Sequence, residues 1–356
     1  MSIPEPGCDV PTGSIRAEPV PIRWDASLPI FAKEEFLRAV GDEYGWLGGT
    51  DESGTMRCIL PYTIVRKAGV RMVRFRVETI PCTGELDLHD EQAFLNSVVR
   101  HFRHARADVI IPASTNTIFR TYPDDAIAAP YGTHIVDLAQ PEAALWAAIS
   151  ANHRRQVRAA EKLGVRIRTD DEYLTTAHSI IRDTFGKSSM RFMRLDALTR
   201  MVRGLGEDVH VFVADQDGRV QSCAVMAFSR HSAYYMYGGS IADAAPGSMH
   251  LLHWEAMRLY RQLGVRRYDF CGARVTPAPG SKAEGLATFK QRFGARFHQG
   301  FMWKCRISAW KSAVYSLAVR HLRGGDIVDV ERHKLRAVVA GKSDSRQSRE
   351  SYTDDQ

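Results

Sequence analysis

The chain has 356 residues, of which 44% are hydrophobic, 9% aromatic and 25% charged. This composition is close to that of average globular proteins and excludes a disordered, collagen-like or coiled-coil protein. The length predicts two or three domains, and no uncharged apolar run approaches the roughly 18 residues of a membrane-spanning helix. The first residues have neither a basic start nor an apolar stretch, so we expect no signal peptide and a cytoplasmic protein.

The positive charge is concentrated in two segments. The net charge is +7, from 48 basic and 41 acidic residues. Residues 152–168 contain six Lys and Arg against one Glu, and residues 258–304 contain ten against two acidic residues. Such segments favour an anionic partner, although solvated helix faces whose arginines cover the core give the same pattern.

The first half of the chain has an α/β pattern. Apolar spacing predicts a helix over residues 31–44. Residues 56–67 and 70–80 have the pattern of strands joined by a turn at Ala68-Gly69, and a helix near 90–105 and a strand at 109–111 follow. Residues 121–135 are rich in Pro, Asp and Gly, which predicts a loop, and we place a domain boundary after residue 138.

The second half is more regular. Pro141 begins a helix, and a basic helix that ends at Gly164 follows it. The later pattern predicts strands at 165–168, 210–215, 220–229, 233–237, 268–271 and 296–307, and helices at 171–185, 195–205, 248–264 and 284–293. The turn Asp217-Gly218 predicts that the strands around it form a meander.

The two ends of the chain differ from the middle. Residues 1–14 are rich in Pro and Gly and predict a loose segment, and residues 341–356 have almost no apolar side chain and predict a disordered tail. Residues 308–340 predict a helical extension with an amphipathic start. This extension is a candidate for contact with the inner face of the membrane or with a partner protein.

The segment HWEAMRLYRQLGVRRYDFCGA, followed by GLATFKQRFGARFHQG, resembles the C-terminal signature of the Fem-type aminoacyltransferases in the GNAT acyltransferase superfamily. RQVRAAEKLG at 155–164 is similar to the basic helix that starts their second domain. The resemblance is close over 140–307 and loose over 15–140. It implies an α/β fold of tandem GNAT-like domains, at 15–138 and 139–307, each a mixed, centrally antiparallel sheet flanked by helices.

The resemblance also implies a reaction. Fem-type relatives move an aminoacyl group from aminoacyl-tRNA onto an amine of a peptidoglycan precursor, so we expect a tRNA donor, a nucleotide- or lipid-linked envelope acceptor and no tightly bound cofactor. The fold equally permits an acyl-CoA-dependent N-acyltransferase in polysaccharide or small-molecule biosynthesis. A third alternative is a catalytically silent protein that binds a nucleotide or RNA in the same cleft.

The loop before the helix at 248 bears on the donor. Acetyl-CoA enzymes of this superfamily carry Q/R-x-x-G-x-G/A here, so that successive N–H groups hold the pyrophosphate. Residues 239–248 read GSIADAAPGS, with one glycine beside a proline and with Asp243 inside the loop. This weighs against acetyl-CoA as the donor.

Two residues are candidates for the chemistry. Aminolysis of an ester needs an uncharged amine, stabilisation of the oxyanion and a route for protons. By resemblance, Lys290 lies beside the acyl ester and stabilises its developing negative charge or the adjacent phosphate; the alternative is a solvated lysine on the surface of a helix. Asp269 is a candidate proton acceptor, or a structural carboxylate paired with Arg266, Arg267 or Arg274, since a buried carboxylate needs a partner.

Other residues are candidates for binding. Arg155 and Arg158 have the chemistry to hold phosphates of the donor, and Phe289 is a platform for the tRNA end or a core residue. Ser248 and His250 stand at a helix start, where an anion binds well.

Tyr235 belongs to the predicted strand at 233–237. Strict alternation with Tyr234 makes it a candidate for the acceptor side of the cleft. His250 and His253 have helical spacing but lack a third ligand, so we expect no metal site.

Overall fold

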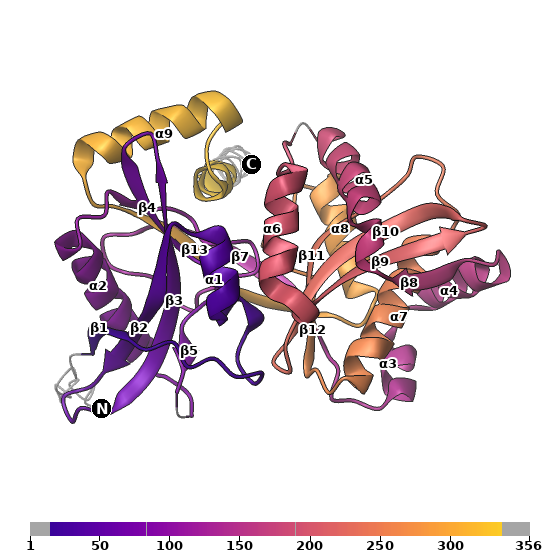
Figure 1. Ribbon diagram of the computed structural model, residues 1–356, viewed down its shortest axis with the longest axis horizontal. Helices are drawn as coiled ribbons and strands as arrows, with labels where there is room; N and C mark the ends of the chain where they lie inside the picture. The colour runs from indigo at the N-terminus through magenta and orange to yellow at the C-terminus, as the bar shows by residue number, and fades with distance from the viewer. Residues whose placement is uncertain (1–14, 83, 189, 337–356) are drawn as a thin grey trace, which may run out of the picture.

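The computed structural model describes residues 15–82, 84–188 and 190–336, which form two lobes that share one continuous sheet (Figure 1). The strand order is β1-β2-β3-β4-β6-β13-β7-β12-β11-β10-β9-β8, and β5 pairs with β3. The expected loose segment 1–14 and the expected disordered tail 341–356 lie outside the described residues.

The N-terminal lobe is a mainly antiparallel sheet with a long helix against it. Its elements are β1 (Arg16–Val20), η1 (Ile30–Ala32), α1 (Glu34–Val40), β2 (Glu43–Thr50), β3 (Met56–Lys67), β4 (Val70–Phe75), β5 (Ile80–Pro81), α2 (Leu88–His104) and β6 (Val109–Ile110). Asp87 caps α2 by accepting a hydrogen bond from the N–H of His89. The predicted turn between β3 and β4 is confirmed, since Ala68 and Gly69 both have positive φ (50° and 74°).

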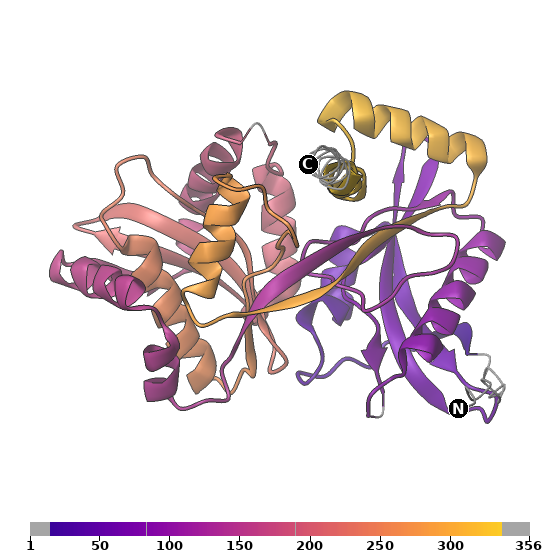
Figure 2. The same cartoon turned by 180° about the vertical axis from the view of Figure 1, so that it is seen from behind.

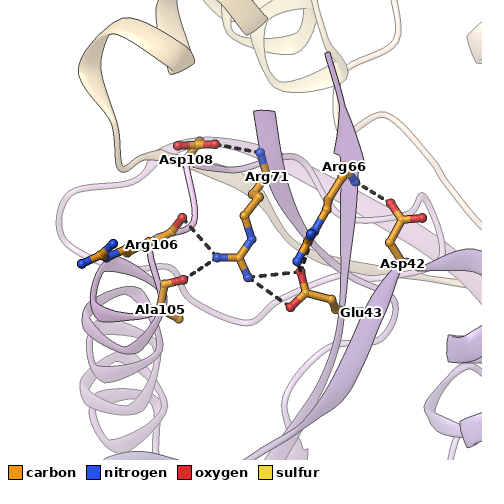
Figure 3. A network of polar contacts seen from close by, with 7 residues as sticks. All are labelled: Asp42, Glu43, Arg66, Arg71, Ala105, Arg106 and Asp108. Carbon is orange, nitrogen blue, oxygen red and sulfur yellow. Dashed lines mark hydrogen bonds and ion pairs between the residues drawn. The ribbon is translucent and has the colours of Figure 1, made fainter. Parts of the chain in front are cut away.

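A polar network ties this hairpin to the end of α2 (Figure 3). The Arg71 guanidinium donates to the backbone carbonyl of Ala105 (2.6 Å) and to the Glu43 carboxylate (3.1 and 3.2 Å). Arg66 donates to the same carboxylate, and Asp108 accepts from the backbone N–H of Arg71. The β3–β4 hairpin and the α2–β6 connection are therefore held in one position, which fixes the direction of β4.

The C-terminal lobe has helices on both faces of its sheet. Its elements are α3 (Glu142–Ala148), α4 (Ala151–Lys162), β8 (Arg166–Thr169), η2 (Asp171–Tyr173), α5 (Leu174–Gly186), α6 (Leu195–Leu205), η3 (Gly206–Asp208), β9 (Val209–Gln216), β10 (Arg219–Phe228), β11 (Ala233–Ser240), α7 (Ser248–Gln262), β12 (Arg267–Asp269) and α8 (Lys282–Gln291). Alternate residues of β9 enter opposite cores: Val211 and Val213 pack with α5 and α6, and Phe212 and Ala214 pack with α4 and α7.

Two long strands connect the lobes (Figure 2). β7 (Ile127–Asp137) and β13 (Arg296–Arg306) pair antiparallel along most of their length, and the end of β13 continues into the N-terminal lobe through its pairing with β6. β7 precedes the boundary expected at residue 138 and pairs with β12 and β13.

The predicted loop at 121–135 is wrong, because β7 occupies residues 127–137. Pro130 argued against a strand, since proline cannot donate a ladder hydrogen bond. The sheet tolerates it because Pro130 has a strand neighbour on one side only: it lies opposite Phe301 of β13, whereas β12 pairs only with residues 135–137. The helix predicted over 31–44 is also shorter than expected, and β2 begins at Glu43.

Helix α9 (Ala309–Arg323) lies across the N-terminal lobe (Figure 1). Asp108 holds it there, by an ion pair with Lys311 (3.2 Å) and by its carbonyl, which accepts from the Ser312 hydroxyl. Trp310 and Leu317, 68% and 70% exposed, form an apolar stripe on its outer face with Val314. Within the described residues, no helix is both long and apolar enough to span a membrane.

Candidate functional site

The backbone makes a kinked turn just after β12, where Cys271 and Gly272 both have φ 50°, before it continues along β7 to Ala273, and Asp269 supports this turn. Its Oδ1 accepts hydrogen bonds from the N–H of Cys271 (2.7 Å) and from the hydroxyl of Thr133 on β7. The bond to Cys271 supports that residue in a left-handed conformation (φ 50°), which is unusual for a residue other than glycine. Asp269 is 5% exposed, and burial raises its pKa to about 6.

The expected ion pair of Asp269 with an arginine is not found among the described residues. Arg274 instead pairs with Glu331 (3.2 Å). The partners of the carboxylate are a hydroxyl and a backbone N–H because β7, which was predicted as a loop, lies beside β12 and supplies Thr133.

Lys290, on α8, is drawn into the same turn. It is 8% exposed, and its ammonium donates to the backbone carbonyls of Cys271 and Gly272 (2.7 Å for the latter). Burial lowers the pKa of Lys290, while the nearby Cys271 and Asp269 oppose this effect. An ammonium has three N–H donors, and among the described residues only these two carbonyls accept from it. The third N–H has no acceptor among the described residues.

A charged face of the N-terminal lobe points toward this turn. Arg74, Arg76 and Glu78 alternate with the buried residues Phe75 and Val77, along β4 and the segment after it. Burial raises the pKa of Glu78 to about 7, and the negative charge of Asp269 contributes. Two carboxylates from different lobes are thus close enough to interact, and both have raised pKa values.

A cavity of about 530 Å³ lies between the lobes, and we call it the interlobe cavity. Its lining includes Arg74, Arg76 and Asn116 from the N-terminal lobe and Met236, Tyr237 and Cys271 from the C-terminal lobe. The turn that Lys290 and Asp269 hold therefore forms part of its wall. The volume is in the range of sites for small molecules.

β11 presents Tyr237, rather than Tyr235, to this cavity. A bulge interrupts the pairing of β10 and β11 between Val225 and Met226, so strict alternation fails along β11. Tyr235 packs instead against His253 (ring centroids 4.7 Å apart) on the opposite face of the sheet. The position of the bulge was not readable from the sequence.

A second cavity, also about 530 Å³, lies between α4, α7 and α8, and we call it the helical cavity. His153, His250, Phe289 and Arg292 contribute to its lining. His250 and Phe289 are ring neighbours (5.2 Å). Burial, with His153 nearby, lowers the pKa of His250 to about 4. At neutral pH its imidazole is uncharged and offers a hydrogen bond to a ligand, not a positive charge.

Ser248 lines neither of the two cavities. It is buried, and its hydroxyl is hydrogen-bonded to Ser222 (2.7 Å). Helix α4 covers the start of α7 so closely that a Cβ on Gly247 would lie 2.0 Å from the carbonyl oxygen of Gln156. The close packing of α4 therefore requires glycine at this position.

Arg155 and Arg158 lie on the exposed side of α4. Arg155 donates to Asn152 (2.8 Å), and the Arg158 guanidinium stacks over Trp146 (5.6 Å). Together with Lys162 and Arg166 they form a basic strip that has no ion pair to any described carboxylate.

The adjacent residues Phe289 and Lys290 contact different cavities. Phe289 lines the helical cavity, and Lys290 donates to the turn that walls the interlobe cavity. The sequence indicated Lys290 and Asp269 as site residues, but Arg74, Arg76 and Glu78 were not predicted. The signal for these three residues is a charge at every second position of an otherwise apolar segment.

Comparisons with known proteins bear on the fold. Residues 148–291 match the family model of the acetyltransferase (GNAT) domain. The fold is that of GNAT acyltransferases. A crystal structure of FemX matches with a TM-score of 0.58 at 14% sequence identity, over 79% of this chain and 92% of FemX.

A second solved structure is similar over a comparable length. The C-terminal domain (DUF2156) of a putative lysylphosphatidylglycerol synthetase from Agrobacterium fabrum matches with a TM-score of 0.50 at 15% identity, over 82% of this chain and 92% of that one. The comparison with curated protein sequences gave no match. The predicted α/β GNAT-like fold and the Fem-type resemblance are confirmed at the level of the fold.

Proposed function

We propose that the protein is an aminoacyltransferase, which moves an aminoacyl group from aminoacyl-tRNA onto an amine acceptor such as a cell-envelope precursor. The donor binds at the basic strip and the helical cavity, and the acceptor binds in the interlobe cavity. No tightly bound cofactor is needed, because an aminoacyl ester is already activated.

The observation that carries this proposal is the position of Lys290. Its ammonium is buried against the turn that walls the interlobe cavity, where carbonyls hold two of its N–H groups and the third has no acceptor among the described residues. A fixed donor in a site of low dielectric stabilises the oxyanion of a tetrahedral intermediate better than a solvated lysine does. A surface lysine, which the sequence alone allowed, would not be held in this way.

The proton route uses the carboxylates. The acceptor amine attacks the ester carbonyl, a C–N bond forms, and the tetrahedral intermediate expels the 3′-terminal ribose oxygen of the tRNA. Asp269 and Glu78, with pKa values near 6 and 7, accept the proton of the amine and return one to the leaving oxygen. Atoms and charges balance without another reactant.

Two observations favour tRNA over CoA as the donor. The basic strip has no acidic partner among the described residues, so its charges are available to phosphates. The start of α7, where a pyrophosphate would bind, lies under α4. An acyl-CoA-dependent N-acyltransferase is the second candidate, favoured by the family model that matches residues 148–291.

The test is a donor competition with the purified protein. Charged tRNA, uncharged tRNA and acetyl-CoA are titrated separately, and binding and donor deacylation are followed. We expect tRNA to bind with micromolar or better affinity that falls steeply with salt, and the charged form to be deacylated when an amine is added.

The alternatives have different outcomes. Saturable binding of acetyl-CoA without tRNA binding would replace this proposal by the acyl-CoA enzyme. Binding of tRNA that is salt-dependent but yields no turnover, and that does not change in Lys290→Ala, would indicate the catalytically silent binding protein.

A further inference from the structure

Two arginines stand side by side on the wall of the interlobe cavity. Arg74 lies on β4, and Arg76 directly follows the last residue of that strand, at a bend in the backbone. Both line the cavity, and the positive charge of Arg74 lies close enough to affect Arg76.

The hydrogen-bond partners of Arg76 are neutral. Its guanidinium donates to the Thr63 hydroxyl (2.9 Å) and to the backbone carbonyl of Val40 (3.0 Å). Within the described part of the chain, no carboxylate forms an ion pair with it. Burial and the neighbouring Arg74 lower the pKa of Arg76 to about 9. A buried cation beside a like charge is unfavourable unless an anion joins it.

Asp42 and Arg200 also line the cavity, and each has a polar partner. Asp42 accepts a hydrogen bond from the backbone N–H of Arg66 (2.6 Å), and Arg200 pairs with Asp196 (3.1 Å). Much of the remaining wall is apolar and comes from α1, α6 and β11. The cavity thus combines an apolar wall with two adjacent guanidinium groups, an arrangement that suits a carbon skeleton ending in an oxyanion.

We propose that the acceptor is a small amine that carries a carboxylate or a phosphate, and that Arg74 and Arg76 bind this oxyanion. The proposal rests on the proposed function and adds the substrate class. Glu78 follows Arg76 by two residues, so their Cα atoms are at most roughly 7 Å apart, and the bend at residues 76–77 shortens this separation. An acceptor bound to the arginines can therefore bring an amine to Glu78 when at most roughly 7 Å separates its two ends.

The test measures binding in the absence of any donor, so it does not depend on turnover. Isothermal titration calorimetry follows 6-aminohexanoate, 5-aminopentyl phosphate and n-hexylamine against the full-length protein. The variants are Arg76→Gln, Arg76→Lys and the matched control Arg103→Gln, which changes an exposed arginine of α2. Circular dichroism melting checks that each variant is folded.

We expect at least one of the two anionic amines to bind saturably and n-hexylamine to bind at least tenfold more weakly. Charge-assisted hydrogen bonds of a guanidinium predict a roughly 10- to 100-fold loss in Arg76→Gln and a smaller loss in Arg76→Lys, which keeps the charge but not the forked geometry. Arg103→Gln should bind like the wild type. Tighter binding of 6-aminohexanoate or of 5-aminopentyl phosphate identifies whether the acceptor carries a carboxylate or a phosphate.

The proposal is overturned if neither anionic amine binds, if n-hexylamine binds as tightly, or if a folded Arg76→Gln or Arg76→Lys variant binds as the wild type does. Anion binding that depends on Arg76, in a protein that transfers nothing from charged tRNA, would keep this site and refute the proposed donor. The two proposals therefore fail separately.

Discussion

Replacing Glu78 with glutamine should stabilise the protein at pH 8 while it slows acyl transfer. The pKa of Glu78 is raised from 4.5 to about 7, and each pKa unit corresponds to about 1.4 kcal/mol. The folded state binds this proton more tightly than the unfolded state, so wild-type stability falls as pH rises from about 4.5 to about 7. Above pH 7 the ionised carboxylate destabilises the fold by about 3 kcal/mol, which Glu78→Gln removes.

Differential scanning calorimetry measures this effect. For the unfolding entropy of a chain of this length, a gain of about 3 kcal/mol at pH 8 corresponds to a Tm increase of roughly 4 °C. At pH 5 the wild-type carboxyl is mostly protonated, so the gain in stability is smaller and the Tm increase is roughly 1 °C. Glu85→Gln, which changes an exposed glutamate nearby, is the matched control and should leave Tm unchanged. A Tm that falls at pH 8, or that rises equally at both pH values, would refute the reasoning.

Four further results are expected. Lys290→Met should slow single-turnover transfer at least 100-fold and leave the Kd of charged tRNA within threefold, and a rate loss under tenfold would remove Lys290 from the chemistry. Combining Arg155→Ala with Arg158→Ala should reduce the slope of log affinity against log salt for tRNA by roughly 1.5, whereas an unchanged slope would place tRNA elsewhere. The transfer rate should rise with pH around 6 as Asp269 loses its proton, and Asp269→Asn should abolish this rise; persistence of the rise would assign it to another group. Trp310→Ser should decrease co-sedimentation with anionic phospholipid vesicles severalfold, and unchanged co-sedimentation would show that the exposed stripe of α9 does not contact membranes.

The elements of the C-terminal lobe were predictable because their signals are local. Gly164 and Gly264 have positive φ and follow the ends of α4 and α7. Asp217-Gly218 forms the turn between β9 and β10. Such signals depend on a few neighbouring residues and need no knowledge of the rest of the chain. The order of strands and helices along this part of the chain followed from these signals.

β2 was not predicted because its glycines leave room for side chains of other elements. A Cβ on Gly49 would lie 2.6 Å from the Cys58 sulfur and 2.8 Å from the ring of Phe94, so the close approach of β3 and α2 requires glycine there. Strand propensity counts glycine against a strand. A local pattern cannot reveal that a distant helix needs the space.

The residues at the centre of the site were predictable, but their partners were not. The segment YDFCG and the lysine after Phe289 indicated Asp269 and Lys290. The contacts of these two residues are to backbone groups and to Thr133, which comes from a strand that the sequence did not reveal. Side chains that meet across the sheet are set by register and bulges, as the exchange of Tyr235 for Tyr237 shows.

The segment after Met72 shows why the substrate side was hidden. Arg74, Arg76 and Glu78 alternate with apolar residues, and an alternating strand normally turns its polar face to water. Here the C-terminal lobe covers that face, and three charges that would be ordinary in solvent become two partly buried guanidinium groups and a carboxylate that holds its proton near neutral pH. Charged side chains that a second lobe covers destabilise the fold. A function that uses these charges is therefore the simplest reason for their presence. If that reason is correct, a variant that removes one of these charges, such as Glu78→Gln, gains stability and loses acyl transfer together.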